Sequence, residues 1–286
     1  MPIMTPEEPG SASHGQRAVA EGFGADAVGY DRARPRYPDA MVARVLASSP
    51  DGPVLDVGCG TGIATRQFEA AGRPVLGVDV DERMTAVAAA AGSTVEVAGF
   101  EDWDPAGRDF AVLIAGQTWH WIDPVAGAAQ AARVLRPGGR IAVFWNVFRP
   151  DPELGAAFAA VYRRVAPPLP FTPWNTATPA GHAALADPAE AGLVGDGRFR
   201  DVERWSFDWD HRYSRADWLD QVPTHGGHRG LPDPVLAELL AGIKEAVDAV
   251  GGAFTMHYTT VVVTAVRRDD QDRPLDRGLI IGAAQQ

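Results

Sequence analysis

Cysteine and lysine are almost absent from this sequence of 286 residues, in which Cys59 and Lys244 are the single examples. One thiol excludes an internal disulfide and any metal site built from several cysteines. The formal net charge is −11 and no run of basic residues occurs. Nucleic-acid binding usually depends on a basic surface that neutralises phosphates. The sequence therefore argues against DNA or RNA as a partner and favours a small molecule.

Long apolar runs are also missing. No stretch reaches the roughly 18 residues that a membrane-spanning helix needs, and residues 1–16 lack the apolar core of a signal peptide. We therefore expect a cytoplasmic protein with no membrane partner, either a monomer or a homodimer. Residues 1–20 mix Pro, Glu, Gly and Ser without periodicity and are expected to be mobile. The polar tail 269–286 is expected to be disordered or to act as a docking segment.

Apolar runs alternate with helical patterns over the first half of the chain. The runs predict strands at 53–57, 74–79, 94–98, 110–115 and 140–146, and helices at 39–47, 61–71, 82–91 and 123–135. Strands that alternate with helices in this way predict a doubly wound α/β sheet with parallel strands. We assign residues 21–147 to this core.

The pattern changes after residue 146. We expect an amphipathic helix at 151–165, a loop rich in Pro, Ala and Thr at 167–185, strands at 200–209 and 259–266, and a helical segment at 214–251. Residues 148–198 are assigned to a lid insertion. Residues 199–268 are assigned to the last two strands with a second lid insertion between them.

The most informative motif is a glycine loop, Val54-Leu-Asp-Val-Gly-Cys-Gly-Thr-Gly62, followed by Asp79 at the end of the next predicted strand. Ligands of doubly wound sheets bind outside the carboxyl ends of the strands. A dinucleotide fingerprint would need glycine where Ile63 stands, and Asp56 would repel a pyrophosphate. An ammonium and a sulfonium would be attracted instead, and Asp79 suits the hydroxyls of a ribose. S-adenosylmethionine (SAM) has these groups.

The chain resembles the class I SAM-dependent methyltransferases. The matching motifs are Asp56 to Gly62, Asp79, Phe100-Glu-Asp102, Gly116-Gln117 and Leu135-Arg-Pro-Gly-Gly139. The resemblance covers roughly residues 28–148, and 199–267 more loosely. It is to type 11 methyltransferases, and parts of the chain are similar to trans-aconitate methyltransferase-like enzymes. It implies a Rossmann-like sheet of seven strands, mostly parallel with an antiparallel last strand, a helical lid, and methylation of a small molecule. The composition, rich in Arg and Pro, suggests a role in secondary metabolism.

The resemblance also implies which residues contact SAM. They are Tyr30, Arg34, Asp56, Gly58, Cys59, Gly60, Asp79, Val80, Met84, Phe100, Glu101, Gly116 and Gln117. Arg34 suits the carboxylate of SAM because a planar guanidinium binds such a group through two hydrogen bonds. At the adenine, Glu101 and Asp102 remain alternatives, and Met84 either packs on the ring or belongs to the core.

Aromatic and imidazole side chains follow the fourth and fifth predicted strands. Trp119 and Trp121 suggest an aromatic wall for the acceptor, with His120 as a general base or as a residue that only shapes the pocket. Trp145 faces either the acceptor or the core. His225 and Arg229 are expected to face the acceptor from the lid. No metal is expected, because glycines separate His225 from His228 and no carboxylate completes a ligand set.

The expected function is transfer of a methyl group from SAM to a small molecule, with oxygen as the acceptor atom. A carboxylate acceptor needs no base, whereas a hydroxyl does. Two alternatives stay open. The first is a SAM-binding subunit or regulator without catalysis, and the second is a nicotinamide-dependent oxidoreductase.

Overall fold

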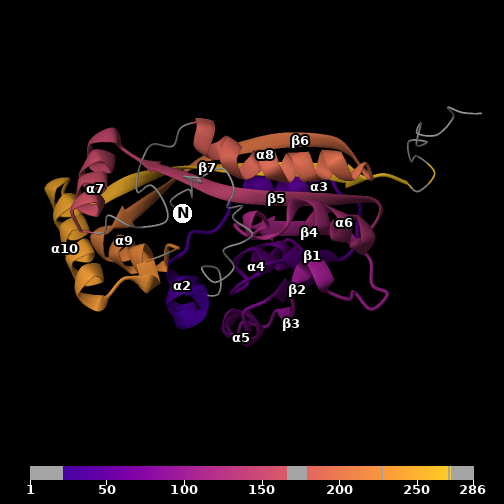
Figure 1. Cartoon of the computed structure of the whole chain (residues 1–286), viewed down its shortest axis with the longest axis horizontal. Helices are drawn as coiled ribbons and strands as arrows, with labels where there is room; N and C mark the ends of the chain where they lie inside the picture. The colour runs from indigo at the N-terminus through magenta and orange to yellow at the C-terminus, as the bar shows by residue number, and fades with distance from the viewer. Residues whose placement is uncertain (1–21, 166–178, 227, 270, 272–286) are drawn as a thin grey trace, which may run out of the picture.

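The computed structural model describes residues 22–165, 179–226, 228–269 and 271. The tails predicted to be mobile or disordered therefore lie almost wholly outside the described residues. A seven-stranded sheet in the order β3-β2-β1-β4-β5-β7-β6 runs through the molecule (Figure 1). The strands are β1 (Val54–Val57), β2 (Val75–Asp79), β3 (Thr94–Val97), β4 (Phe110–Gly116), β5 (Leu135–Pro150), β6 (Phe199–Ser214) and β7 (Ala253–Arg267).

The first five strands are parallel, and β7 runs antiparallel to both β5 and β6. The predicted Rossmann-like sheet with an antiparallel last strand is therefore confirmed. Its central strands are buried on both sides, as expected where helices cover both faces of a parallel sheet. No helix in the described part of the chain is long and apolar enough to cross a membrane.

Helices cover both faces of the core sheet. On one face, α3 (Asp39–Ala47) and α4 (Ile63–Ala70) share an apolar cluster with alternate residues of the central strands. On the other face, α6 (Pro124–Val134) joins the remaining strand residues in a second cluster. Alternation of side chains between the faces follows from the two-residue period of a strand. The fourth core helix, α5 (Glu82–Ala90), flanks β2 and β3.

The prediction of a loop over residues 167–185 is wrong for residues 179–185, which are helical. Residues 166–178 are outside the described part, but Pro179–Asp196 forms the helix α8. Ala189 and Leu193 of α8 pack into the same cluster as α6, so α8 covers the sheet instead of forming a lid. A Cβ at Gly192 would lie 2.4 Å from the Pro124 carbonyl oxygen, so glycine permits this close approach. Small residues and the internal Pro188 weakened the helical pattern in the sequence.

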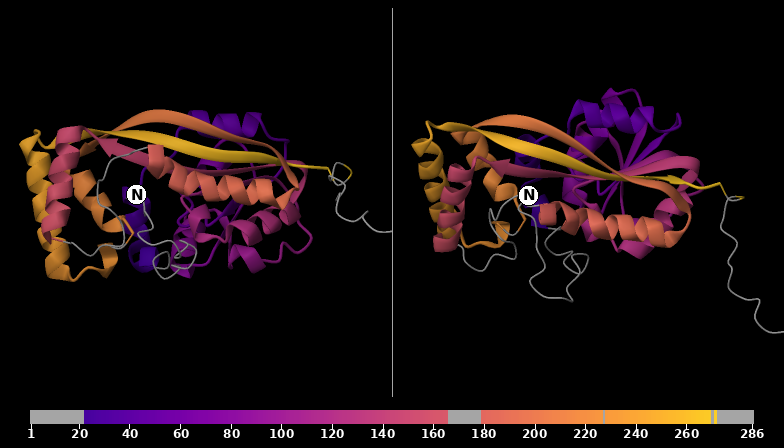
Figure 2. Two further views of the ribbon diagram at one scale, coloured as in Figure 1. Left: turned by 45° about the horizontal axis from the view of Figure 1, so that its top comes forward. Right: turned by 90° about the horizontal axis from the view of Figure 1, so that it is seen from above.

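The last three strands are longer than predicted and carry a second cluster of helices. β5, β6 and β7 contain 16, 16 and 15 residues and continue as an antiparallel ribbon beyond the core (Figure 2). On the far part of this ribbon lie α7 (Pro152–Val165), α9 (Arg215–Gln221), α10 (Asp233–Ala249) and the 3-10 turns η5 (Val222–Thr224) and η6 (His228–Gly230). We call these five elements, with the ribbon ends that carry them, the cap.

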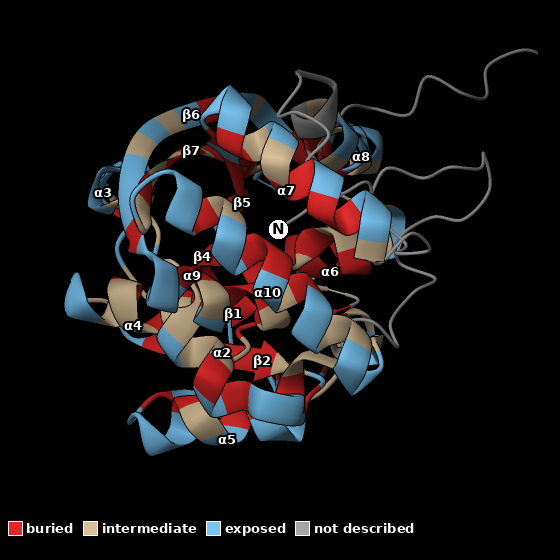
Figure 3. Cartoon of the chain, turned by 90° about the vertical axis from the view of Figure 1, so that its left-hand side faces the viewer, coloured by how far each residue is buried: buried red, intermediate tan, exposed pale blue. Residues whose placement is uncertain are grey.

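The cap has its own apolar interior. Phe158, Trp218, Ile243 and Phe254 are among its buried side chains, and none of them belongs to either core cluster. Viewed from the cap side, buried positions form stripes along α7 and α10, and exposed positions face outward (Figure 3). The cap is therefore a packed unit that can shield a site without being part of the core.

The short helix α2 (Ala27–Ala33), preceded by the 3-10 turn η2 (Gly22–Asp26), connects the two parts. It lies between the cap and α5 (Figure 1). Arg32 pairs with Asp220 of α9 at 3.1 Å, and Nη2 of Arg34 donates to the Thr224 carbonyl at 2.6 Å. The segment that precedes the first core strand thus holds the cap over the carboxyl ends of the sheet.

Candidate cofactor and acceptor site

A pocket of about 1360 Å³, counting its open mouth, lies between the carboxyl ends of the core strands and the cap. Its lining reaches from the glycine loop on the core to Phe148, Gln221 and Tyr258 on the cap. Each residue predicted to contact SAM lines it: Tyr30, Arg34, Asp56, Gly58, Cys59, Gly60, Asp79, Val80, Met84, Phe100, Glu101, Gly116 and Gln117. Parallel strand ends bring these distant segments to one edge of the sheet.

The glycine loop has a backbone that other residues rarely adopt. Gly58, Gly60 and Gly62 have φ angles of 63°, 54° and 81°. A Cβ at Gly58 would lie 2.0 Å from Cγ2 of Thr118, whose hydroxyl donates to the Gly58 carbonyl at 3.0 Å. Glycine is therefore needed at position 58 for both its conformation and its close contact with the segment after β4.

Asp79 is fixed at the end of β2 by two backbone amides. Its Oδ2 accepts from the Gly60 amide at 2.8 Å, and its Oδ1 accepts from the Asp81 amide at 2.9 Å. Burial raises the pKa of Asp79 above its ordinary value. Each carboxylate oxygen keeps a second lone pair, so Asp79 can still accept from two neighbouring hydroxyls of a ribose.

Asp56 is a buried carboxyl group with one unused oxygen. Its Oδ2 accepts from the Thr65 hydroxyl at 2.6 Å, whereas Oδ1 has no partner among the described residues. Burial raises the pKa of Asp56 to about 7, and the neighbouring charge of Asp79 adds to the shift. A ligand cation would favour the ionised form and occupy the unused oxygen.

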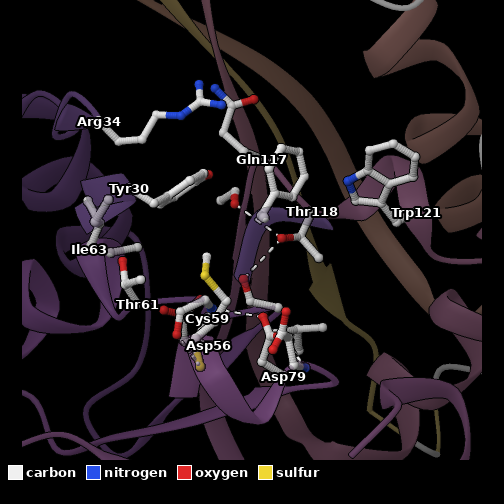
Figure 4. A pocket seen from close by; sticks show the side chains of 18 of the residues that line it. Tyr30, Arg34, Asp56, Cys59, Thr61, Ile63, Asp79, Gln117, Thr118 and Trp121 are labelled. Carbon is white, nitrogen blue, oxygen red and sulfur yellow. Dashed lines mark hydrogen bonds between the residues drawn. The ribbon is translucent and has the colours of Figure 1, made fainter. Parts of the chain in front are cut away.

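Arg34, a half-buried side chain, is the counterpart of Asp56 because its guanidinium has one buried, unused nitrogen. One side of its guanidinium is held by the Thr224 carbonyl, its Nε has no partner among the described residues, and it lies 4.9 Å from the centre of the Tyr30 ring. Arg34 and Gln117 lie on the side of the pocket away from Asp56 and Asp79, with Tyr30 between them (Figure 4). An unused acceptor and an unused donor match the ammonium and the carboxylate of SAM.

The segment after β4 is strained and held in place. Gln117 has a φ of 60°, its amide donates to the Phe144 carbonyl at 2.8 Å, and its Nε2 donates to the Asn146 carbonyl at 3.2 Å. Residues other than glycine rarely adopt this backbone conformation. Where they do, the strained residue usually belongs to a functional site. The turn at Gln117 places the next residue, Thr118, against Gly58 of the glycine loop.

Of the five residues predicted at the acceptor end whose side chains the structure describes, Trp121 alone lines the pocket. Trp119 and Trp145 are buried in the core cluster below α6. Nδ1 of His120 accepts a hydrogen bond from the indole Nε1 of Trp145 at 3.2 Å, and His120 is not among the described lining residues. Burial lowers the pKa of His120 to about 3, so this histidine stays neutral.

His225, one of the two cap residues expected at the acceptor, is also not among the described lining residues. His225 is buried inside the cap, where it stacks on Phe148 with ring centres 5.8 Å apart. Burial lowers the pKa of His225, and the charge of Arg34 lowers it further. The side chain of Arg229 lies outside the described residues. Among the residues that the structure describes, no group of three or more His, Cys, Asp or Glu side chains is placed to hold a metal.

Several residues that line the pocket were not among the predicted site residues. The main ones are Phe23, Tyr37, Thr61, Thr118, Ile122, Asn146, Phe148, Gln221 and Tyr258. Phe148 and Tyr258 meet only because β5 and β7 pair with these two residues opposite each other. Asn146 follows the core residue Trp145 on β5, so strand alternation was the one pattern that pointed to it.

Comparison with known proteins agrees with this geometry. Residues 55–143 match the family described as a methyltransferase domain. An uncharacterized methyltransferase of Mycobacterium tuberculosis is 37% identical over 134 residues, which are 46% of this chain and 54% of that protein. A structure from Anaeromyxobacter dehalogenans, assigned as a type II methyltransferase, has a TM-score of 0.58 and 25% identity, and covers 82% of this chain and 97% of its own. Residues 55–143 thus form a methyltransferase domain, and these matches support a class I SAM-dependent methyltransferase.

The match to curated members of this family is partial. The malonyl-[acyl-carrier protein] O-methyltransferase of Pseudescherichia vulneris is 30% identical over 156 residues, 52% of this chain and 62% of that enzyme. The chain spans about half the length of the M. tuberculosis relative, 54%. The family match at 55–143 lies within the core that carries the glycine loop and Asp79, and the cap lies outside it.

Proposed function

We propose that this chain transfers a methyl group from SAM to an oxygen atom of a small-molecule acceptor. The observation that carries the proposal is the pair of buried, unused polar atoms at the pocket, Oδ1 of Asp56 and Nε of Arg34. SAM carries an ammonium and a carboxylate on the α-carbon of its methionine end, and these are the kinds of group that would satisfy such an acceptor and such a donor. A nicotinamide dinucleotide would instead bring its pyrophosphate against Asp56.

Different residues of the pocket are proposed to bind different groups of SAM. Asp79 accepts the ribose hydroxyls, Arg34 binds the carboxylate, and Asp56 binds the ammonium. Phe100 and Glu101 lie at the adenine end, where Asp102 is not part of the lining. SAM, when bound, supplies an electrophilic methyl group on a sulfonium. Fixing both reactants next to each other supplies much of the acceleration of such a displacement, and the cap excludes water that would weaken the electrostatic contacts.

The acceptor oxygen is proposed to be ionised before it binds. His120 does not line the pocket, and burial keeps its pKa near 3, so it does not remove a proton from the acceptor. A carboxylate needs no base, whereas an alcohol does. The name of the P. vulneris relative, an O-methyltransferase, agrees with oxygen as the acceptor atom.

The proposal is tested by turnover with methyl-labelled SAM and a panel of carboxylic acids, phenols, alcohols and amines. We expect labelled methyl esters from one group of carboxylic acids and formation of one S-adenosylhomocysteine per ester. Labelled amines without esters would contradict the choice of oxygen. Tight SAM binding without transfer to any acceptor would favour the alternative of a non-catalytic SAM-binding subunit.

A further inference from the structure

We propose that the cap side of the pocket is an acceptor subsite that recognises an uncharged hydrogen-bond donor, a hydroxyl or a carboxamide, on an aromatic body. The subsite consists of Gln221, Tyr258 and Phe148, all of which line the pocket and come from the cap. The inference rests on the proposed function and adds the chemistry of the part of the acceptor that does not react.

Gln221, the last residue of α9, is the centre of this subsite. Its side chain is 1% exposed, and its Oε1 has no hydrogen-bond partner among the described residues. Its Nε2 lies 3.4 Å from Nε2 of His225. In this orientation the amide nitrogen faces His225, and the oxygen is the atom left to accept a hydrogen bond from a ligand donor. A buried amide atom without a partner is costly, so a ligand group that supplies one is favoured.

Tyr258 adds a second polar atom next to Gln221. Its hydroxyl lies 2.7 Å from the Tyr213 hydroxyl, and its ring stacks on Trp209 with centres 4.3 Å apart. When Tyr213 donates to Tyr258, the Tyr258 hydroxyl can donate into the pocket. Burial raises the pKa of Tyr258 to about 12, so the group recognises a ligand and does not act as a base.

The walls of the subsite are aromatic. Phe148 and Tyr258 lie opposite each other on β5 and β7 with ring centres 5.6 Å apart, and Trp121 and Tyr30 line the same pocket. Rings of this kind favour a planar, apolar ligand body because they stack on it or meet it edge to face. The subsite therefore combines a flat apolar surface with two adjacent polar atoms.

The charges around the subsite favour a neutral group. Arg34 is the only basic side chain among the described residues of the lining, and the Thr224 carbonyl already holds one of its nitrogens. Its charge also acts on Tyr258, so it would repel an ammonium bound there. No second cation of the described lining is available for a polyanion. A hydroxyl or a carboxamide has no net charge, so Arg34 does not repel it and it needs no second cation.

The experiment compares two small probes by NMR titration of protein saturated with S-adenosylhomocysteine. Benzamide carries N–H donors, and benzonitrile has the same ring with an acceptor only. We expect benzamide to bind about tenfold more tightly to the wild type, as one hydrogen bond to a buried partner would give. Gln221→Leu is expected to remove this preference, and Tyr258→Phe to reduce it.

Matched variants separate recognition from damage to the fold. Gln130→Leu replaces another buried glutamine, which donates to the Trp103 carbonyl outside the pocket, and Tyr162→Phe replaces a buried cap tyrosine that contacts His228. Both should keep the preference for benzamide. If Gln221→Leu does not fold, the preference of Tyr258→Phe for benzamide over benzonitrile tests the subsite instead.

The results that overturn the subsite differ from those that overturn the proposed function. Equal binding of the two probes to the wild type, no binding of either, or an unchanged preference in the folded variants would overturn the subsite. Failure of S-adenosylhomocysteine itself to bind would overturn the proposed function instead.

Discussion

The indole Nε1 of Trp145 donates a hydrogen bond to Nδ1 of His120 across 3.2 Å. The indole can only donate, so Nδ1 of His120 is the acceptor and the ring is the neutral tautomer with its proton on Nε2. Trp145 is 1% exposed, and neither residue of the pair is among the described residues that line the pocket. His120 is thus a partner for a buried indole, placed next to a site that it does not enter.

Replacing His120 should change stability more than turnover. In His120→Ala the Trp145 indole loses its acceptor, which we expect to cost about 1–3 kcal/mol in the free energy of unfolding. Denaturant unfolding and turnover of the variant measure the two effects, and His211→Ala, at an exposed histidine, is the control. A fall of about 10²–10⁴ in turnover with unchanged stability would show that His120 is a general base after all.

The same histidine predicts a dependence of stability on pH. Its pKa is lowered from 6.5 to about 3 in the folded chain, so between these values the unfolded chain binds the proton and the folded chain does not. Stability from the neutral His120 is complete above pH 6.5 and is lost as the pH falls toward 3. His120→Gln should therefore lose less stability than the wild type over this range. Parallel curves for the two proteins would contradict the buried, neutral state.

Ligand binding should release a proton from Asp56. In the folded chain its pKa is raised from 3.8 to about 7, so the carboxyl group is mostly protonated at pH 6 and contributes stability that is lost as the pH rises through 7. An ammonium placed against Oδ1 favours the ionised form. Calorimetry at pH 6 in buffers of different ionisation enthalpy should show release of up to about one proton with S-adenosylhomocysteine. It should show none with 5′-methylthioadenosine, which lacks the ammonium. Equal release with both ligands, or persistence in Asp56→Asn, would rule out Asp56 as the source.

Arg34→Lys should weaken the binding of ligands that carry a carboxylate. A lysine cannot bind the Thr224 carbonyl and a carboxylate with one planar group, so we expect about a tenfold loss for S-adenosylhomocysteine. Binding of 5′-methylthioadenosine, which has no carboxylate, should change little. Arg32→Lys is the matched control, since Arg32 is exposed and pairs with Asp220. Equal losses for both ligands would place Arg34 in a structural role only.

Gly58→Ala should damage the loop more than Gly72→Ala. Both residues have positive φ angles, 63° and 88°, so each substitution costs about 1 kcal/mol from backbone strain. Only at Gly58 would the new Cβ also meet Thr118, at 2.0 Å, whereas no atom lies within 4 Å at Gly72. Thermal unfolding and S-adenosylhomocysteine affinity of the two variants should therefore diverge. Similar behaviour would mean that the contact with Thr118 relaxes at no cost.

Patterns within single elements predicted the core well. The glycine loop and Asp79 are local features at strand ends, and the topology brings them together without further information. The cap was harder, because Phe148 and Tyr258 become neighbours only through the pairing of two strands more than 100 residues apart in sequence. Trp145 was ambiguous because a tryptophan at a strand end faces the core or the ligand according to a one-residue alternation. The helix α8 was missed because its alanines and glycines pack closely without an obvious apolar stripe.

Calorimetry tests the central claim, SAM binding at this pocket, most directly. SAM, S-adenosylhomocysteine and NAD(H) would be titrated in parallel into the wild type, into Asp79→Ala and into Glu82→Gln, an exposed carboxylate on α5. We expect micromolar binding of the first two ligands to the wild type and to Glu82→Gln, and a loss of about tenfold or more in Asp79→Ala. Binding of NAD(H) alone, or SAM affinity unchanged in Asp79→Ala, would contradict SAM binding at this pocket.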